Sequence, residues 1–163
     1  MTVGDQSGST LAHDRRAVAP SGRVAVDGKQ FAVEGQRFAF RGVTYGTFKP
    51  RLSDGANYPE RDQMKLDFTA MSAAKFTVVR TYTAPPDDLL DLAADCGLRV
   101  LAGVFYSDWR YLVGDSRRDR RGVAGRARQE VTDTARRLAG REQVLAVSLG
   151  NEVPADVVRW LGP

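Results

Sequence analysis

Apolar and polar side chains alternate through residues 24–41, and the pairs Asp27-Gly28 and Glu34-Gly35 interrupt the alternation. A period of two is typical of β-strands, and such pairs are typical of hairpin turns. The pattern therefore predicts a small β-meander. Its last strand is expected to continue through residues 38–46.

Helical spacing of apolar side chains follows in three segments, at residues 60–75, 85–97 and 123–140. The second segment begins with prolines and aspartates and ends at Gly97, which are start and stop signals for a helix. A fourth helix is expected to begin near Pro154, which is well suited to a first helical turn.

Continuous apolar runs at residues 76–82, 98–106 and 143–152 separate these segments. Such runs indicate strands that are covered on both faces, as in a parallel sheet with crossover helices. The segment after the first strand, "GVTYGTF", lacks the glycine spacing of a dinucleotide fingerprint or a P-loop.

The order of elements, four strands that alternate with four helices, favours an α/β fold of the TIM-barrel type. A complete barrel has eight such units and about 250 residues, so this chain is expected to form the first four units, a half-barrel. We expect this partial barrel, with its N-terminal β-hairpin or meander, to span residues 23–163, after a flexible polar leader at residues 1–22.

The composition of the chain is that of an ordinary globular protein, with 42% hydrophobic and 27% charged residues. No run approaches the ~20 apolar residues of a membrane helix. The N-terminal segment has no apolar stretch of the kind found in secretory signals, so the cytoplasm is the default compartment.

Histidine and cysteine chemistry is sparse. The single His13 lies in the polar leader, and the single Cys96 lies on an apolar helix face. A Ser-His-Asp or Cys-His device and a histidine-rich zinc site are therefore excluded. Carboxylates are the expected carriers of any chemistry, and we expect no metal and no cofactor.

Seven arginines lie between Arg110 and Arg128, and the formal net charge of the chain is +4. Nucleic-acid binding is one interpretation of this run, and it predicts an affinity that falls steeply with salt. The acids Asp115 and Asp119 within the run favour the other interpretation, a solvated loop. We therefore expect no nucleic-acid partner.

The expected strand ends carry a distinctive mixture of side chains. In barrel enzymes the carboxyl ends of the strands face the active site. These ends carry Tyr45 on the first strand, Arg80 and Tyr82 on the second, Tyr106, Asp108 and Trp109 on the third, and Asn151 and Glu152 on the fourth. Aromatic, amide and charged groups together suit a polyhydroxylated ligand.

Several of these residues have a second interpretation. Tyr45, Tyr82 and Trp109 could instead pack the rim, and Arg80 could pair with a structural carboxylate. Glu152 is harder to explain by packing, because a carboxylate that ends so apolar a strand is costly unless it is paired or used. An inward-facing carboxyl in such surroundings could donate a proton near neutral pH.

The segment "VSLGNEVP" resembles the acid/base motif of clan A glycoside hydrolases, a superfamily of retaining (β/α)8 glycosidases. The hairpin "VDGKQFAVEGQRFAFRGVTYG" and the strand "FTVVRTY" support the resemblance. The segments "PPDDLLDLAADCGLRVLAGV" and "GNEVPADVVRW" are most similar to one group within that clan. Its members are related to the family 2 and family 5 catalytic domains and begin long bacterial chains that also carry a family 2 glycosyltransferase.

The resemblance covers residues 24–161 and implies a role for each matching position. Glu152 matches the general acid/base, and Asn151 matches the amide that hydrogen-bonds the sugar 2-hydroxyl. Arg80 matches the arginine that lies under the nucleophile. Tyr45, Tyr82 and Trp109 are candidate subsite walls, and the substrate is an oligo- or polysaccharide.

The chain departs from the clan in its second carboxylate. Retaining hydrolysis needs one about 5–5.5 Å from the first, and the clan supplies it from strand seven, beyond the four units expected here. Asp108 is the nearest acid by rim position, whereas Glu60, Glu130 and Glu142 lie in helical or loop segments.

Two hypotheses about the function of the chain follow. One is a truncated retaining glycoside hydrolase module acting on a β-linked glycan. The other is a non-catalytic carbohydrate-binding or scaffold half-barrel that self-associates through its open edges or pairs with a missing C-terminal half.

Overall fold

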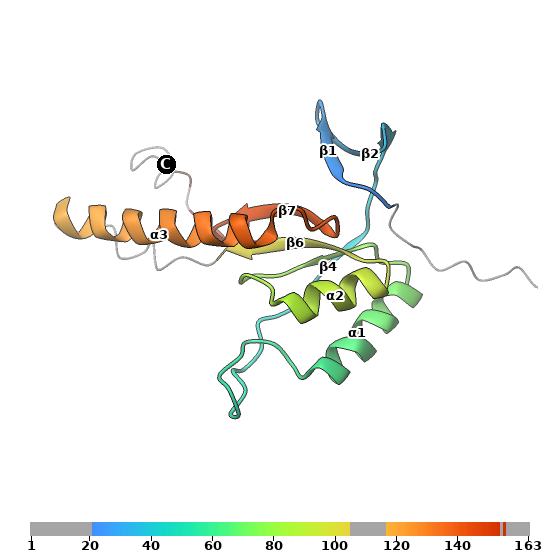
Figure 1. The fold of residues 1–163 in the computed structure, drawn as a ribbon, viewed down its shortest axis with the longest axis horizontal. Coiled ribbons are helices and arrows are strands. Elements are labelled where there is room, and N and C mark those ends of the chain that lie inside the picture. Colours follow the sequence, from blue (N-terminus) through green and yellow to red (C-terminus); the bar gives the residue numbers. More distant parts are fainter. Residues whose placement is uncertain (1–20, 105–116, 154, 156–163) are drawn as a thin grey trace, which may run out of the picture.

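A computed structural model describes residues 21–104, 117–153 and 155 of the chain. Within them lie a three-stranded antiparallel sheet in the order β1-β2-β3 and a four-stranded parallel sheet in the order β4-β5-β6-β7 (Figure 1). The strands are β1 Val24–Asp27, β2 Gln30–Val33, β3 Gln36–Arg37, β4 Gly42–Thr44, β5 Val78–Arg80, β6 Arg99–Val104 and β7 Val144–Leu149. The helices are α1 Arg61–Ala73, α2 Asp87–Asp95 and α3 Arg117–Leu138. The expected leader and the expected fourth helix lie almost wholly outside the described residues.

The small antiparallel sheet confirms the predicted meander. Glu34 and Gly35, which join β2 to β3, both have positive φ, at 50° and 73°. A two-residue loop with two positive φ angles matches the twist of an antiparallel pair. The sequence therefore indicated the place of this turn.

The expected continuation of the last meander strand through residues 38–46 is wrong. β3 ends at Arg37, and β4 begins at Gly42 in the other sheet. Phe38 still donates its backbone N–H to the Phe31 carbonyl oxygen of β2 at 2.7 Å. Its ring is 7% exposed and packs with Val78 and Leu145 of the parallel sheet, so the chain passes from one sheet to the other directly after this residue.

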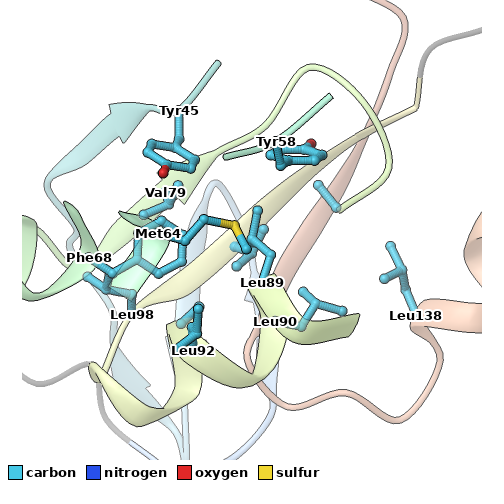
Figure 2. Packing of buried hydrophobic residues seen from close by; sticks show 13 residues of the cluster. Tyr45, Tyr58, Met64, Phe68, Val79, Leu89, Leu90, Leu92, Leu98 and Leu138 are labelled. Atoms are coloured by element: carbon cyan, nitrogen blue, oxygen red, sulfur yellow. The ribbon is translucent and has the colours of Figure 1, made fainter. Parts of the chain in front are cut away.

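The face of the parallel sheet that α1 and α2 cover is called the helix face here (Figure 1). Val79, Val100 and Ala102 of this face are completely buried. They pack in one cluster with Phe68 of α1 and Leu89 of α2 (Figure 2). Both helices were predicted from the spacing of their apolar residues. These residues form the stripe of each helix that packs into this cluster.

The opposite face, called the hairpin face here, is covered by the small sheet near the amino ends of its strands. Val78 and Leu145 pack there against Val33 and Phe38. Arg99 is 3% exposed and donates hydrogen bonds to the carbonyl oxygens of Gly22 (2.7 Å) and Glu142 (2.5 Å). Burial lowers the pKa of this guanidinium below its ordinary value. The arginine thus fastens the start of the hairpin to the sheet.

The third helix begins earlier than expected. α3 starts at Arg117 rather than at residue 123, so residues 117–122, which were expected to belong to an arginine-rich loop, are helical. Arginine has a high helix propensity, and Gly122 and Gly125 weaken a helix without ending it. Beyond the last turn, Arg141 pairs with Asp91 of α2 at 2.9 Å. None of the described helices has both the length and the apolar character needed to cross a membrane.

Candidate active site

Two of the predicted rim residues meet at the carboxyl ends of β5 and β7. Arg80 is the last residue of β5, and Asn151 follows β7 by two positions. The Arg80 Nη2 donates a hydrogen bond to Asn151 Oδ1 at 2.6 Å, although the two residues are 71 positions apart. Parallel strands end at the same edge of their sheet, so the fold itself creates this contact.

Tyr82 lies against the same guanidinium. The Arg80 Cζ is 4.7 Å from the centroid of the Tyr82 ring, which is within the range of a cation–π contact. Both side chains are half-buried. Tyr82, Arg80 and Asn151 therefore form a contiguous group, named here the rim triad.

Glu152 follows the rim triad directly in sequence but is exposed. The exposed side chain differs from the desolvated carboxyl considered from the sequence, and the role of Glu152 stays a prediction. The end of β7 is itself uncovered, since Leu149 is 59% exposed.

The backbone at Glu152 is left-handed, with φ of 51°. This conformation costs a non-glycine residue roughly 1–2 kcal/mol. Glu34 and Lys75 have the same conformation, so the angle by itself marks a sharp change of chain direction after β7.

Tyr45 has the packing role that was its second interpretation. It is 4% exposed, and its hydroxyl donates a hydrogen bond to Asp67 Oδ2 of α1 at 2.6 Å. Its ring lies 5.0 Å from that of Phe68, in the cluster on the helix face (Figure 2). Burial, and then the contact with Asp67, raises the pKa of Tyr45 above its ordinary value.

Trp109, with Tyr106 and Asp108, lies outside the described residues. Among the other acids considered, Glu60 pairs with Arg51 at 2.7 Å, and Glu142 contributes its backbone carbonyl to Arg99. Glu130 is exposed on α3. In the described part of the chain, no group of three or more His, Cys, Asp or Glu side chains could hold a metal ion.

Sequence reasoning missed the two residues that support the rim triad from below. Thr81 is fully buried, and its Oγ1 accepts a hydrogen bond from the Gly103 backbone N–H at 3.2 Å. A Cβ on Gly103 would stand 2.4 Å from the Thr81 carbonyl oxygen. The signal was a glycine within the apolar strand "VLAGV", which often marks a close approach of another backbone.

Comparisons with known proteins add likeness of fold. The chain matches no model of a known protein family, and no curated protein matches it either. Among solved structures it is similar to a β-glucuronidase from Lactobacillus rhamnosus, with a TM-score of 0.62 and 19% identity over 80% of this chain. Two structures of a glycosyl hydrolase family 2 member from Bacteroides cellulosilyticus, one of them from strain DSM 14838, match 84% of this chain with TM-scores of 0.56 and 0.57 and identities of 18% and 20%.

The chain spans about a fifth of the length of these structures, 22% of the first and 18% of each of the others. At such low identity the likeness establishes a shared fold. The arrangement of the strands in this chain is therefore that of a segment of glycoside hydrolase structures.

Proposed function

We propose that this chain supplies the first four β/α units of a (β/α)8 module of a retaining glycoside hydrolase that acts on a β-linked glycan. The four parallel strands lie in the sheet in the order in which they occur along the chain, as successive barrel units do. The fold likeness to glycosyl hydrolase family 2 structures supports the same assignment. The resemblance of "VSLGNEVP" to the clan A acid/base motif names the residues.

The observation that carries the proposal is the hydrogen bond from Arg80 to Asn151 at the carboxyl edge of the sheet. It holds an amide beside Glu152 at the edge where barrel enzymes bind their substrates. In the proposed reaction Glu152 protonates the glycosidic oxygen and later activates water. Asn151 donates a hydrogen bond to the sugar 2-hydroxyl, an interaction that strengthens in the transition state.

Retaining chemistry also requires a nucleophilic carboxylate about 5–5.5 Å from Glu152. Arg80 would lie beneath that carboxylate and stabilise its charge. Trp109 is the proposed wall of the sugar subsite. Neither cofactor nor metal takes part in this reaction scheme.

The test is carried out on the polypeptide as its natural source produces it. Glu152→Gln should lower the turnover of glycosides with poor leaving groups by about 10²–10⁴-fold, since it removes the general acid. Azide should restore turnover to Glu152→Ala and give a β-glycosyl azide. Glu130→Gln is the matched control, an exposed glutamate on α3 whose replacement should leave turnover unchanged. Equal turnover in Glu152→Gln and the control would remove Glu152 from this role.

A second candidate function is a carbohydrate-binding or scaffold half-barrel that forms dimers. The described β4 and β7 each pair with one neighbour in the sheet, and Leu149 at the end of β7 is 59% exposed. Unpaired strand edges and exposed apolar side chains favour association. Sedimentation that gives a dimer, together with calorimetric binding of oligosaccharides and no hydrolysis, would favour this function over the first. A monomer without affinity for sugars would exclude it.

A further inference from the structure

We propose that Tyr82 is a positioning residue, which holds the Arg80 guanidinium so that the Asn151 amide presents its N–H groups to the bound sugar. This inference deepens the proposed function and rests on it for the identity of the ligand. It also replaces the view of Tyr82 as chiefly a subsite wall. The relevant contacts all lie within the rim triad and the strand beneath it.

The direction of the Arg80–Asn151 hydrogen bond fixes the orientation of the amide. A guanidinium has five donors and no acceptor, so it can bond only the oxygen of Asn151. The Oδ1 is thereby occupied, at 2.6 Å from Arg80 Nη2. Within the described residues the Nδ2 group donates no hydrogen bond, so its two N–H groups are available to another partner. A hydroxyl oxygen of a sugar can accept such a hydrogen bond.

The described contacts of the Arg80 guanidinium are the Asn151 amide and the ring of Tyr82. A planar guanidinium that lies over an aromatic ring keeps its N–H groups in its own plane, free to donate sideways. The ring of Tyr82 therefore restrains the plane of Arg80 while the edge of the guanidinium bonds Asn151. Without the ring, the long arginine side chain would have other rotamers available.

Tyr82 is itself held in place by β6. The Thr81 backbone N–H donates to the Leu101 carbonyl oxygen at 3.0 Å. A Cβ on Gly103 would stand only 2.5 Å from the Tyr82 carbonyl oxygen, so the backbone of Tyr82 packs directly against the backbone of β6. The Tyr82 ring also borders Gly46, where an added Cβ would lie 4.0 Å from the Tyr82 Cδ2. The position of Asn151 thus depends on β6 through Tyr82 and Arg80.

A positioning role and a wall role predict different results for Tyr82→Leu and Tyr82→Phe. The leucine keeps an apolar surface but cannot make a cation–π contact, whereas the phenylalanine keeps the ring and loses only the hydroxyl. If Tyr82 positions Arg80, the phenylalanine variant behaves as the unsubstituted protein and the leucine variant does not.

The first measurement requires no enzymatic activity. In ¹H–¹⁵N spectra, the side-chain amide signals of Asn151 are assigned by their loss in Asn151→Ser. Tyr82→Leu should shift these signals and accelerate the hydrogen exchange of the Arg80 guanidinium about tenfold or more, whereas Tyr82→Phe should leave both unchanged. Circular dichroism confirms that each variant is folded. Where Tyr82→Leu does not fold, Tyr82→Met provides the same comparison, since methionine also keeps an apolar side chain and has no aromatic ring. Asn151 signals that stay unchanged in the folded variant would overturn the inference.

The second measurement compares aryl glycosides with and without the 2-hydroxyl group. Tyr82→Leu should lower kcat/KM about tenfold or more for the 2-hydroxy substrate, chiefly through kcat, and much less for the 2-deoxy substrate. Equal losses on both substrates would indicate a wall and overturn the positioning role. If the spectra change as expected but no glycoside is hydrolysed, the positioning role stands and the proposed function fails.

Discussion

The two faces of the parallel sheet carry different kinds of side chain, although the same strands build both. On the helix face, Val79, Val100 and Ala102 are completely buried beneath α1 and α2. On the hairpin face, Val78 is buried at the amino end of β5, whereas Arg80, two residues later, is half-buried and bonds Asn151. Apolar packing thus dominates the helix face. On the hairpin face, polar contacts begin beyond the residues that the small sheet covers.

This difference indicates that the packing that stabilises the chain and the polar contacts of the rim lie on different parts of the sheet. Close-packed apolar contacts on the helix face supply free energy of folding that does not depend on the rim. The carboxyl edge of the hairpin face can then carry a half-buried guanidinium and a left-handed Glu152, both of which are unfavourable by themselves. Substitutions on the helix face should therefore change stability, and substitutions at the rim should change the site.

The largest effect is expected from Phe68→Ala on the helix face. The ring is completely buried between α1 and the sheet, so its loss leaves a cavity. We expect the free energy of unfolding in urea to fall by about 3–5 kcal/mol. Leu66→Ala, in the same helix but at a position that is 66% exposed, should change it by about 0.5 kcal/mol or less. Comparable losses in the two variants would mean that the helix face does not carry the stability.

Gly103→Ala tests the contact between the buried strand β6 and the backbone that supports the rim triad. The new Cβ would overlap the backbone of residues 81 and 82, and neither β5 nor β6 can yield without moving Arg80. We expect a loss of about 1–3 kcal/mol in the free energy of unfolding, typical of overpacking. We also expect a shift of the Asn151 amide signals in NMR spectra.

Gly125→Ala is the control for this substitution. An added Cβ there has no atom within 4 Å, and alanine favours a helix over glycine by about 1 kcal/mol, so this variant should be more stable. A Gly103→Ala variant as stable as Gly125→Ala would show that the approach of the two strands is not tight.

The sequence allowed much of the architecture to be predicted, because most of the described helices and strands have an apolar pattern that matches the neighbours they pack against. α1, α2, the hairpin and the order of the parallel strands follow from local spacing and turn residues. The start of α3 was missed because its first turns have little apolar pattern, being rich in arginine and glycine. The apolar pattern therefore does not predict the start of a helix whose first turns carry few apolar residues.

The candidate site was only partly predictable. That Arg80 and Asn151 lie at one edge follows from the parallel order of the strands. The burial of Tyr45 on the helix face does not follow from the strand order, because its side chain is directed by contacts with Asp67 and Phe68, which are distant in sequence. The support by Gly103 was equally hidden, because a close approach of two backbones leaves only a missing side chain in the sequence. Strand ends thus locate residues, and tertiary contacts decide which way they point.

The smallest effect is expected from Tyr45→Phe, which removes one polar contact from the helix face and leaves its packing intact. At neutral pH the loss of the hydrogen bond to Asp67 should cost about 0.5–1.5 kcal/mol in the free energy of unfolding. Asp67 stays partly satisfied, because its Oδ1 accepts a hydrogen bond from Gln63 at 2.8 Å. A loss as large as that of Phe68→Ala would mean that the phenol, and not the ring, secures the rim to α1.

The pH dependence of the same variant sharpens the comparison. Burial, and secondarily Asp67, raises the pKa of Tyr45 in the folded chain. Below about pH 10, the ordinary tyrosine value, folded and unfolded chains both hold the phenolic proton, and the contribution of Tyr45 to stability is complete. As the pH rises further, the unfolded chain releases its proton while the folded chain keeps it, so the free energy of unfolding falls. Tyr45→Phe lacks this fall, although Tyr58, whose pKa burial also raises, still contributes one in both proteins. Urea titrations at pH 8 to 11 should therefore show the two stabilities converging, and parallel curves would mean that the Tyr45 phenol is not buried beside Asp67 in the folded chain.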